Sequence, residues 1–174
     1  MFLFGHIGVT LGIFFGLGIF LPRLKTFINP KYLVIGALLP DLIDKPLGRV
    51  IFASSIANGR IIGHTLFFSL ILFMMGLYLY DKRRDVRVFS LATGAFFHLM
   101  EDQMWKTPIT LFWPLFGLRF PKDYTDNSGI MYLMRELENS FTFHFSQSAI
   151  PEILGMGVIV VLSLHWLIKR FRQA

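Results

Sequence analysis

Five long apolar segments constrain the fold of this chain more than any other feature. Polar residues and clusters of Lys and Arg separate them. An apolar helix of about 20 residues can cross the roughly 30 Å hydrocarbon core of a bilayer, and a helix satisfies its own backbone hydrogen bonds there. The sequence therefore predicts an all-α fold, a polytopic membrane helical bundle of about five helices forming one domain over residues 1–174. The segments cover approximately residues 2–21, 31–44, 61–80, 86–105 and 151–168.

Two parts of the chain do not fit a simple series of spans. The segment over residues 31–44 is short, because about fourteen residues rise only about 21 Å as a helix. We expect it to be tilted, extended back through Thr26, or re-entrant. Residues 106–149 are polar and aromatic, and we expect them to form an outer interfacial segment of the same domain.

Composition supports a membrane location and limits the functional classes. Apolar residues make up 54% of the chain and charged residues 16%, well below the roughly 25% charged residues of soluble domains. The net charge of +6 does not indicate nucleic-acid binding, because no basic stripe or nucleic-acid motif accompanies it. The chain contains no cysteine, so nitrogen and oxygen atoms would have to bind any metal ion.

The distribution of basic residues predicts the topology. Short loops rich in Lys and Arg stay in the cytoplasm, and the three densest clusters follow the first, third and fifth segments. If all five segments span, the N-terminus of this multi-pass cell-membrane protein is outside and its C-terminus is cytoplasmic. The clusters are Arg23/Lys25/Lys31, Lys82/Arg83/Arg84/Arg87 and Lys169/Arg170/Arg172.

Several ionisable side chains interrupt the apolar segments and indicate a functional site. Burying such groups in a bilayer is costly, so they usually pair with one another at a site. His98 and Asp102 are four residues apart and Asp41 and Asp44 are three apart, so each pair would share one helix face. With the predicted topology, all the candidates converge at the outer face, where we expect a metal centre. The candidate residues are His6, Asp41, Asp44, His64, His98 and Asp102.

Some of these residues, and others nearby, have a simpler interpretation. Asp41 follows Pro40 and could cap a helix. Glu101 would point about 100° away from Asp102 around a helix, which favours a role behind the ligands or facing solvent. Glu152 at the start of the fifth segment suits the helix dipole, but it also lies at the right depth to bind metal. His144 belongs to an alternating, extended pattern.

A family resemblance rests on an ordered series of motifs. Gly36-Ala-Leu-Leu-Pro-Asp-Leu-Ile-Asp44, Gly63-His-Thr65, the His98/Asp102 pair and Phe112-Trp-Pro-Leu115 resemble the membrane-bound metal-dependent hydrolases, also described as LexA-binding, inner-membrane-associated hydrolases. The resemblance covers most of the chain. It implies a membrane-embedded hydrolase that uses metal-activated water.

A more distant resemblance to the zinc-dependent phospholipases C implies roles for individual residues. His64, His98 and Asp102 would bind one zinc ion, and Asp102 would bridge to a second ion held with His6. The resemblance also makes Asp41 or Asp44 the catalytic residue that orients or deprotonates water, and it lets Glu152 serve a further ion. The chain lacks the N-terminal tryptophan and the second His-x-x-x-Glu motif of those enzymes, so we expect one or two divalent ions, most simply zinc.

The expected substrate follows from the position of the site. A site at the outer headgroup level would act on a lipid-like ester or phosphoester, such as a phospholipid or an isoprenoid phosphate. Lys45, Arg49 and Arg60 lie between the second and third segments and are candidates for binding its phosphate, although basic residues there also snorkel without a ligand. Membrane lipids are the expected partners, nucleic acid is not, and the oligomeric state stays open.

Two other functional classes remain as alternatives. In one, the metal is structural and the protein is a membrane scaffold or regulator that uses residues 106–149 as its interaction surface. In the other, the charges form an ion or proton pathway. Their clustering at one face argues against a pathway across the bilayer.

Overall fold

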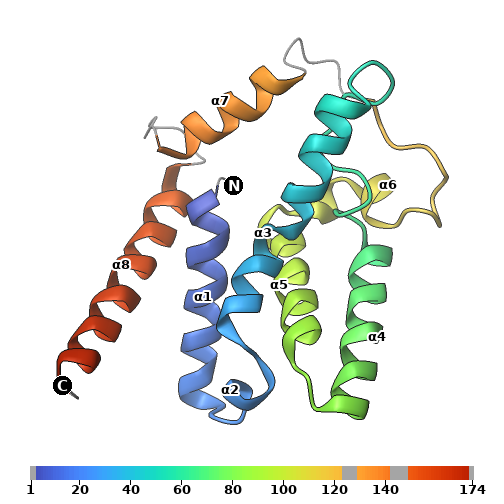
Figure 1. Ribbon diagram of the computed structural model, residues 1–174. Helices are drawn as coiled ribbons and strands as arrows, with labels where there is room; N and C mark the ends of the chain where they lie inside the picture. The colour runs from blue at the N-terminus through green and yellow to red at the C-terminus, as the bar shows by residue number, and fades with distance from the viewer. Residues whose placement is uncertain (1–2, 123–128, 142–148, 173–174) are drawn as a thin grey trace.

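A computed structural model describes residues 3–122, 129–141 and 149–172, and the described residues form helices joined by turns and loops (Figure 1). This confirms the all-α prediction. The helices are α1 (Leu3–Phe20), α2 (Leu24–Phe27), α3 (Pro30–Pro46), the π-helix η1 (Leu47–Ile51), α4 (Leu66–Arg83), α5 (Arg87–Glu101), the 3-10 helix η2 (Met104–Lys106), α6 (Pro108–Leu111), α7 (Ile130–Phe141) and α8 (Ala149–Phe171).

The five longest apolar helices pack side by side (Figure 1). Helix α3 lies against α5 and α1, while α4 packs on α5 and α8 packs on α1. Close approach requires residues without a side chain at the crossings. A Cβ atom on Gly36 or Gly94 would collide with the backbone of the other helix of the α3–α5 pair, and one on Gly8 would collide with Gly155 of α8. The glycines therefore set the spacing of the bundle.

Two of the described helices could span a membrane, as judged by their length and composition. Helix α1 and residues 150–171 of α8 are long and apolar enough to cross a bilayer. Helix α4 is also apolar over most of its length, but it ends in the charged residues Asp81, Lys82 and Arg83. A bundle of five spans therefore stays a prediction.

Several predicted boundaries are wrong. Helix α3 begins at Pro30, where Asn29 caps it by accepting a hydrogen bond from the amide of Lys31, and it continues forward to Pro46 instead of back through Thr26. The third segment becomes helical at Leu66, after the N-cap Thr65, so His64 lies in a loop and not in a first turn. The outer segment contains the amphipathic helix α7, which was not predicted.

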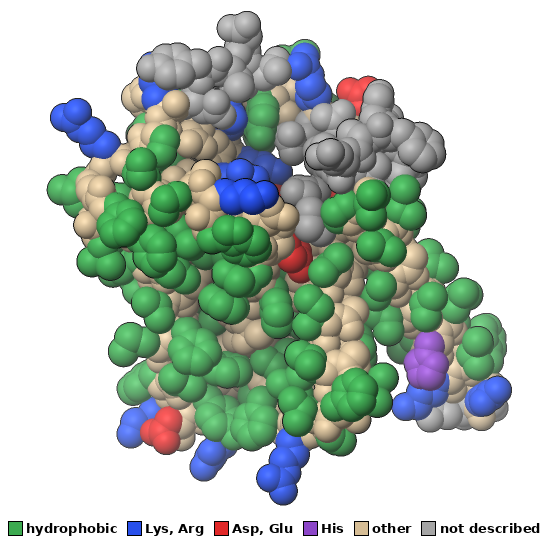
Figure 2. Space-filling model, turned by 180° about the vertical axis from the view of Figure 1, so that it is seen from behind, with side chains coloured by type: hydrophobic (Ala, Val, Ile, Leu, Met, Phe, Trp, Pro, Cys, Tyr) green, Lys and Arg blue, Asp and Glu red, His purple; other side chains and the backbone are tan. Residues whose placement is uncertain are grey.

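The two ends of the bundle differ from its middle. On the face that Figure 2 shows, exposed hydrophobic side chains cover the middle of the molecule, and Lys and Arg side chains gather toward its ends. The three predicted basic clusters lie in the connection from α1 to α3, near the connection from α4 to α5, and at the C-terminal end of α8. All three places are at the end of the bundle opposite α7 and the N-terminus (Figure 1).

Candidate metal centre

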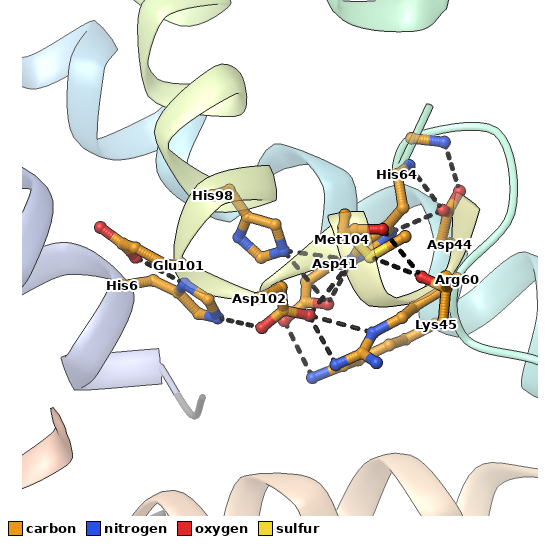
Figure 3. Close-up of polar contacts among 12 residues, drawn as sticks. His6, Asp41, Asp44, Lys45, Arg60, His64, His98, Glu101, Asp102 and Met104 are labelled. Atoms are coloured by element: carbon orange, nitrogen blue, oxygen red, sulfur yellow. Dashed lines mark hydrogen bonds and ion pairs between the residues drawn. The ribbon is translucent and has the colours of Figure 1, made fainter. Parts of the chain in front are cut away.

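The direction of the helices brings most of the predicted site residues to one end of the bundle. Helix α1 starts at the α7 end with His6 in its second turn, and α3 and α5 run toward that end and carry Asp41 and His98 in their second halves. His64 lies in the loop before α4, and Asp102 directly follows α5 as its C-cap. These five side chains meet in one cluster (Figure 3).

The rings of His64 and His98 are oriented as metal-binding imidazoles are. Nδ1 of His98 donates to the carbonyl oxygen of Ala37 at 2.6 Å, and Nδ1 of His64 lies 2.7 Å from Oδ2 of Asp44. A carbonyl or an ionised carboxylate can only accept, so each Nδ1 carries the proton and each Nε2 carries a lone pair. These two Nε2 atoms are only 3.2 Å apart. A proton on one ring or a metal ion between the rings would relieve the repulsion of two lone pairs that face each other at this distance.

Asp41 completes a group of three candidate ligands with these rings. Its Oδ1 lies 3.6 Å from Nε2 of His64 and 3.8 Å from Nε2 of His98. Ligands at about 2.0–2.1 Å from a tetrahedral zinc ion are about 3.3–3.4 Å apart. The three separations of 3.2, 3.6 and 3.8 Å are close to this value, so the residues fit a divalent ion with small adjustments of the side chains.

A second group overlaps the first. His6, His98 and Asp102 also present three ligand atoms to one another, and the rings of His6 and His98 are stacked with centroids 4.0 Å apart. Asp102 lies between the groups, with Oδ1 3.4 Å from Nε2 of His6 and Oδ2 3.7 Å from Nε2 of His64. Its carboxylate is therefore within reach of ligand atoms of both groups.

Glu101 orients His6 from behind. Its Oε2 lies 2.7 Å from Nδ1 of His6, and its Oε1 accepts a hydrogen bond from Thr10 at 2.8 Å. The side chain is 6% exposed, which agrees with a place behind the ligands and excludes the solvent-facing alternative. Thr10 could not be identified from the sequence, because a threonine on an apolar helix commonly bonds only its own backbone.

The structure separates the two aspartates of α3, which were both predicted as catalytic. Asp44 is fully buried and accepts hydrogen bonds from the amides of Ile61, Gly63 and His64, as well as from the His64 ring. It thus holds the loop and the ring in place without facing the other ligands. Asp41 lies inside α3 and faces the cluster, so the helix-cap interpretation of Asp41 is wrong.

Two of the three predicted phosphate-binding residues contact the cluster. Nζ of Lys45 lies 2.9 Å from Oδ2 of Asp41, and Nη2 of Arg60 lies 2.8 Å from Oδ2 of Asp102. Arg49 is instead 7% exposed and stacks on the ring of Tyr132 of α7, 4.7 Å from its centroid. Arg49 therefore contacts the outer helix, whereas Lys45 and Arg60 neutralise site carboxylates.

Glu152 belongs to neither ligand group. It is 4% exposed, and its Oε2 accepts a hydrogen bond from the amide of Gly5 in the first turn of α1. The structure thus places it at the contact between α1 and α8, where it satisfies a helix-terminal amide. His144 lies outside the described residues.

The cluster is closed on most sides and open on one. The side chains of His6, His64 and His98 are fully buried, whereas that of Asp41 is 19% exposed. Asp41 also borders a groove beside α7. Among the described residues, the cluster is therefore accessible on the side of Asp41.

Comparison with known protein families gives a match over almost the whole chain. Residues 1–173 match the model of the YdjM inner membrane protein family. Comparisons with curated proteins and with solved structures give no significant match. The match supports the inner-membrane part of the predicted resemblance and leaves its hydrolase and phospholipase parts as predictions. Because the match covers almost the whole sequence, the chain belongs to the YdjM inner membrane protein family.

Proposed function

We propose that the protein is a membrane-embedded, metal-dependent hydrolase that acts on a lipid-like ester or phosphoester at the outer membrane face. The arrangement of the imidazoles carries this proposal. His64 and His98 have their Nδ1 atoms held by acceptors and their Nε2 atoms 3.2 Å apart beside Asp41. Acceptors that fix the tautomer of a histidine from behind are typical of metal sites.

The ligand set suits one or two zinc ions. His64 and His98 are the proposed ligands of the first ion, with Asp102 in place of Asp41 as the third ligand, because Oδ2 of Asp102 also lies only 3.7 Å from Nε2 of His64. His6 with a shared Asp102 would hold a second ion. Zinc in an open nitrogen and carboxylate site lowers the pKa of water to about 7 and polarises a phosphoryl or carbonyl oxygen. His98 can serve only one of the two overlapping groups through its single free nitrogen, so occupancy of both requires Asp102 as the bridge.

Asp41 is the proposed general base. It is the cluster carboxylate on the open side, and it lies within reach of a molecule that enters from the groove. Lys45 and Arg60 contact the two site carboxylates, which supports a role for both cations in binding a phosphate at the site. In this proposal they bind the phosphate, and Asp44 and Glu101 keep His64 and His6 in their tautomers.

The proposed outward orientation follows from the charges of the two ends. The basic clusters lie at the end opposite the His and Asp cluster, and basic ends stay in the cytoplasm. The metal centre would then open at the outer headgroup level. A phospholipid or an isoprenoid phosphate presents its ester bond at that depth.

The decisive experiment combines metal content with turnover. Elemental analysis of detergent-purified protein should find one or two divalent ions per chain, and metal-dependent hydrolysis of a phospholipid, an isoprenoid phosphate or a simple ester should stop on chelation and return with zinc. Asp41→Asn should reduce turnover by about 10²- to 10⁴-fold with a much smaller loss of metal. If Asp41→Asn loses metal in proportion to activity, Asp41 is a ligand and not the base.

A second experiment tests the orientation. The chain lacks cysteine, so a single cysteine can be introduced at Asn58, beside the cluster, or at Arg83, at the basic end. In sealed right-side-out vesicles, an impermeant thiol reagent should label position 58 and spare position 83. The opposite pattern would place the metal centre on the cytoplasmic side.

A structural metal in a scaffold or regulatory protein is the competing function. The full burial of the three imidazoles favours it, since structural ions are enclosed by protein ligands. Metal-loaded protein that binds its ion stoichiometrically but hydrolyses none of the three substrate types would favour this function over the proposed one.

A further inference from the structure

A groove of about 280 Å³ runs beside the metal centre, between the start of α1, the second half of α3 and α7. Leucines form most of its wall, namely Leu38 and Leu42 of α3 and Leu133 and Leu137 of α7. Asp41 and Lys45 are its charged residues. The groove is thus apolar along its sides and charged where it meets the site.

The spacing of the groove residues along each helix places the leucines and the charged residues in one continuous surface. Leu38 lies three residues before Asp41 and four before Leu42, and Lys45 lies four residues after Asp41 and three after Leu42, so the four share one face of α3. Leu133 and Leu137 are four residues apart and share one face of α7. An apolar chain that lies along these faces would bring a polar group attached to it next to Asp41.

Asp41 connects the groove with the metal centre directly. Its Oδ1 faces the Nε2 atoms of His64 and His98, and its Oδ2 lies 2.9 Å from Nζ of Lys45. An anionic group at Lys45 would therefore lie one side chain away from the candidate ligands. The charge of Lys45 suits a phosphate, and the leucines suit a hydrocarbon.

We propose that the groove holds one hydrocarbon chain of an anionic lipid substrate, with the phosphate of that lipid at Lys45. This inference rests on the proposed function and specifies its substrate class. Ligand pockets commonly have volumes of about 300–1,000 Å³, so a groove of about 280 Å³ is at the lower limit. It suits a single chain, as in an isoprenoid or monoacyl phosphate, better than both chains of a diacyl lipid.

Contacts at the start of α7 hold the second wall of the groove. The amide of Gly129 donates to the carbonyl oxygen of Arg49 at 2.6 Å, and the guanidinium of Arg49 stacks on Tyr132. Leu133 is the next residue along α7. Arg49, which was predicted to bind phosphate, is in this inference a positioning residue for the groove.

Photo-cross-linking with a single-chain lipid tests the inference without requiring turnover. The probe is dodecyl phosphate with a diazirine near the end of its chain, added to the full-length protein in detergent. The label should map to residues 38–46 and 130–138. Excess unlabelled dodecyl phosphate should compete at least tenfold better than inorganic phosphate. Equal competition by inorganic phosphate, or a label mainly on α4 or α8, would overturn the inference.

Matched variants make the test specific. Leu38→Trp and Leu133→Trp fill the groove and should reduce labelling at least tenfold, whereas Leu70→Trp on the exposed face of α4 should leave it unchanged. If the tryptophan variants do not fold, Leu42→Asp at an exposed position should reduce labelling by repelling the phosphate. Unchanged labelling in folded groove variants would overturn the inference. Metal binding and hydrolysis of a short, water-soluble ester would then still stand as separate tests of the proposed function.

Discussion

At the α7 end of the bundle the charged side chains are buried against one another, whereas at the opposite end they face outward. Asp102 and Glu101 are 5% and 6% exposed in the cluster, while Asp81 and Lys82 of the basic end are 76% and 62% exposed. Both ends contain ion pairs. The difference is that most charged groups of the cluster are shielded from solvent, so protein groups or a bound ion must compensate their charges.

This comparison shows which charges carry functional information. A buried charge costs free energy unless partners surround it, so the cluster needs Asp44, Glu101 and the Ala37 carbonyl behind its imidazoles. Asp85 at the basic end pairs with Arg87 in an exposed site. There the guanidinium lowers the pKa of Asp85 to about 2, but water already solvates both charges.

The largest difference between the two ends should appear in metal binding. His98→Ala removes the imidazole shared by both ligand groups, so we expect stoichiometric metal to be lost completely. His165→Ala, in the exposed second half of α8, is the matched control and should keep full metal content. Elemental analysis of both purified variants checks this. Wild-type metal content in His98→Ala would remove the functional distinction between the ends.

A smaller loss of metal affinity is expected for a residue that orients a candidate ligand without binding the ion itself. Asp44→Asn keeps the size of the side chain but loses the charge that holds Nδ1 of His64. Loss of such a partner commonly weakens metal affinity by about 10- to 100-fold. Competition with a chelator of known affinity measures the change. Unchanged affinity would mean that Asp44 only stabilises the loop through the amides of Ile61 and Gly63.

Glu152 should affect stability without affecting metal. Glu152→Gln weakens the charged acceptor for the amide of Gly5, and a hydrogen bond to a charged group contributes about 1.5–3 kcal/mol. We expect a lower thermal unfolding temperature in detergent and unchanged metal content. Loss of metal in this variant would instead support the prediction from the sequence that Glu152 is a ligand.

The smallest effect is expected at the basic end. The pKa of Asp85 is lowered from 3.8 to about 2, so its contribution to stability is present above about pH 4 and is lost as the pH falls through about 2. Asp85→Asn should therefore show a small, constant loss of stability from pH 5 to 8 that shrinks toward pH 2. Thermal unfolding over this range measures it. A loss comparable to that of Glu152→Gln would contradict the comparison.

Much of the fold was predictable because apolar length is a local property. The positions of α1, α3 and α8 agree with the predicted segments to within a few residues. The start of α4 was predicted too early, because the amides of Ile61, Gly63 and His64 before it bond to the side chain of Asp44 instead of starting a helix. This partner comes from α3 and cannot be read from the sequence of the loop. The helix α7 was missed because it is short and charged residues such as Arg135 and Glu138 interrupt its apolar residues, in a stretch that was interpreted as polar and aromatic.

The candidate site was also predictable only in part from the sequence. The alternation of basic clusters along the chain predicted that His6, Asp41, His64, His98 and Asp102 would lie at one end, and the structure brings these residues together. The sequence could not separate Asp41 from Asp44, because both lie on one helix and differ only in the groups that face them. Nor could it place Arg49 on Tyr132, which is 83 residues away in the chain.

The helical class, the apolar segments and the convergence of metal-binding residue types at one end could be predicted, because they follow from hydrophobicity and helical periodicity along the chain. Which atoms face one another depends on tertiary packing: Nε2 of His64 lies toward Nε2 of His98, Asp44 behind His64, Glu152 on Gly5, and the leucines of α3 and α7 across a groove. These contacts join distant segments, and their geometry depends on how the glycines let the helices approach.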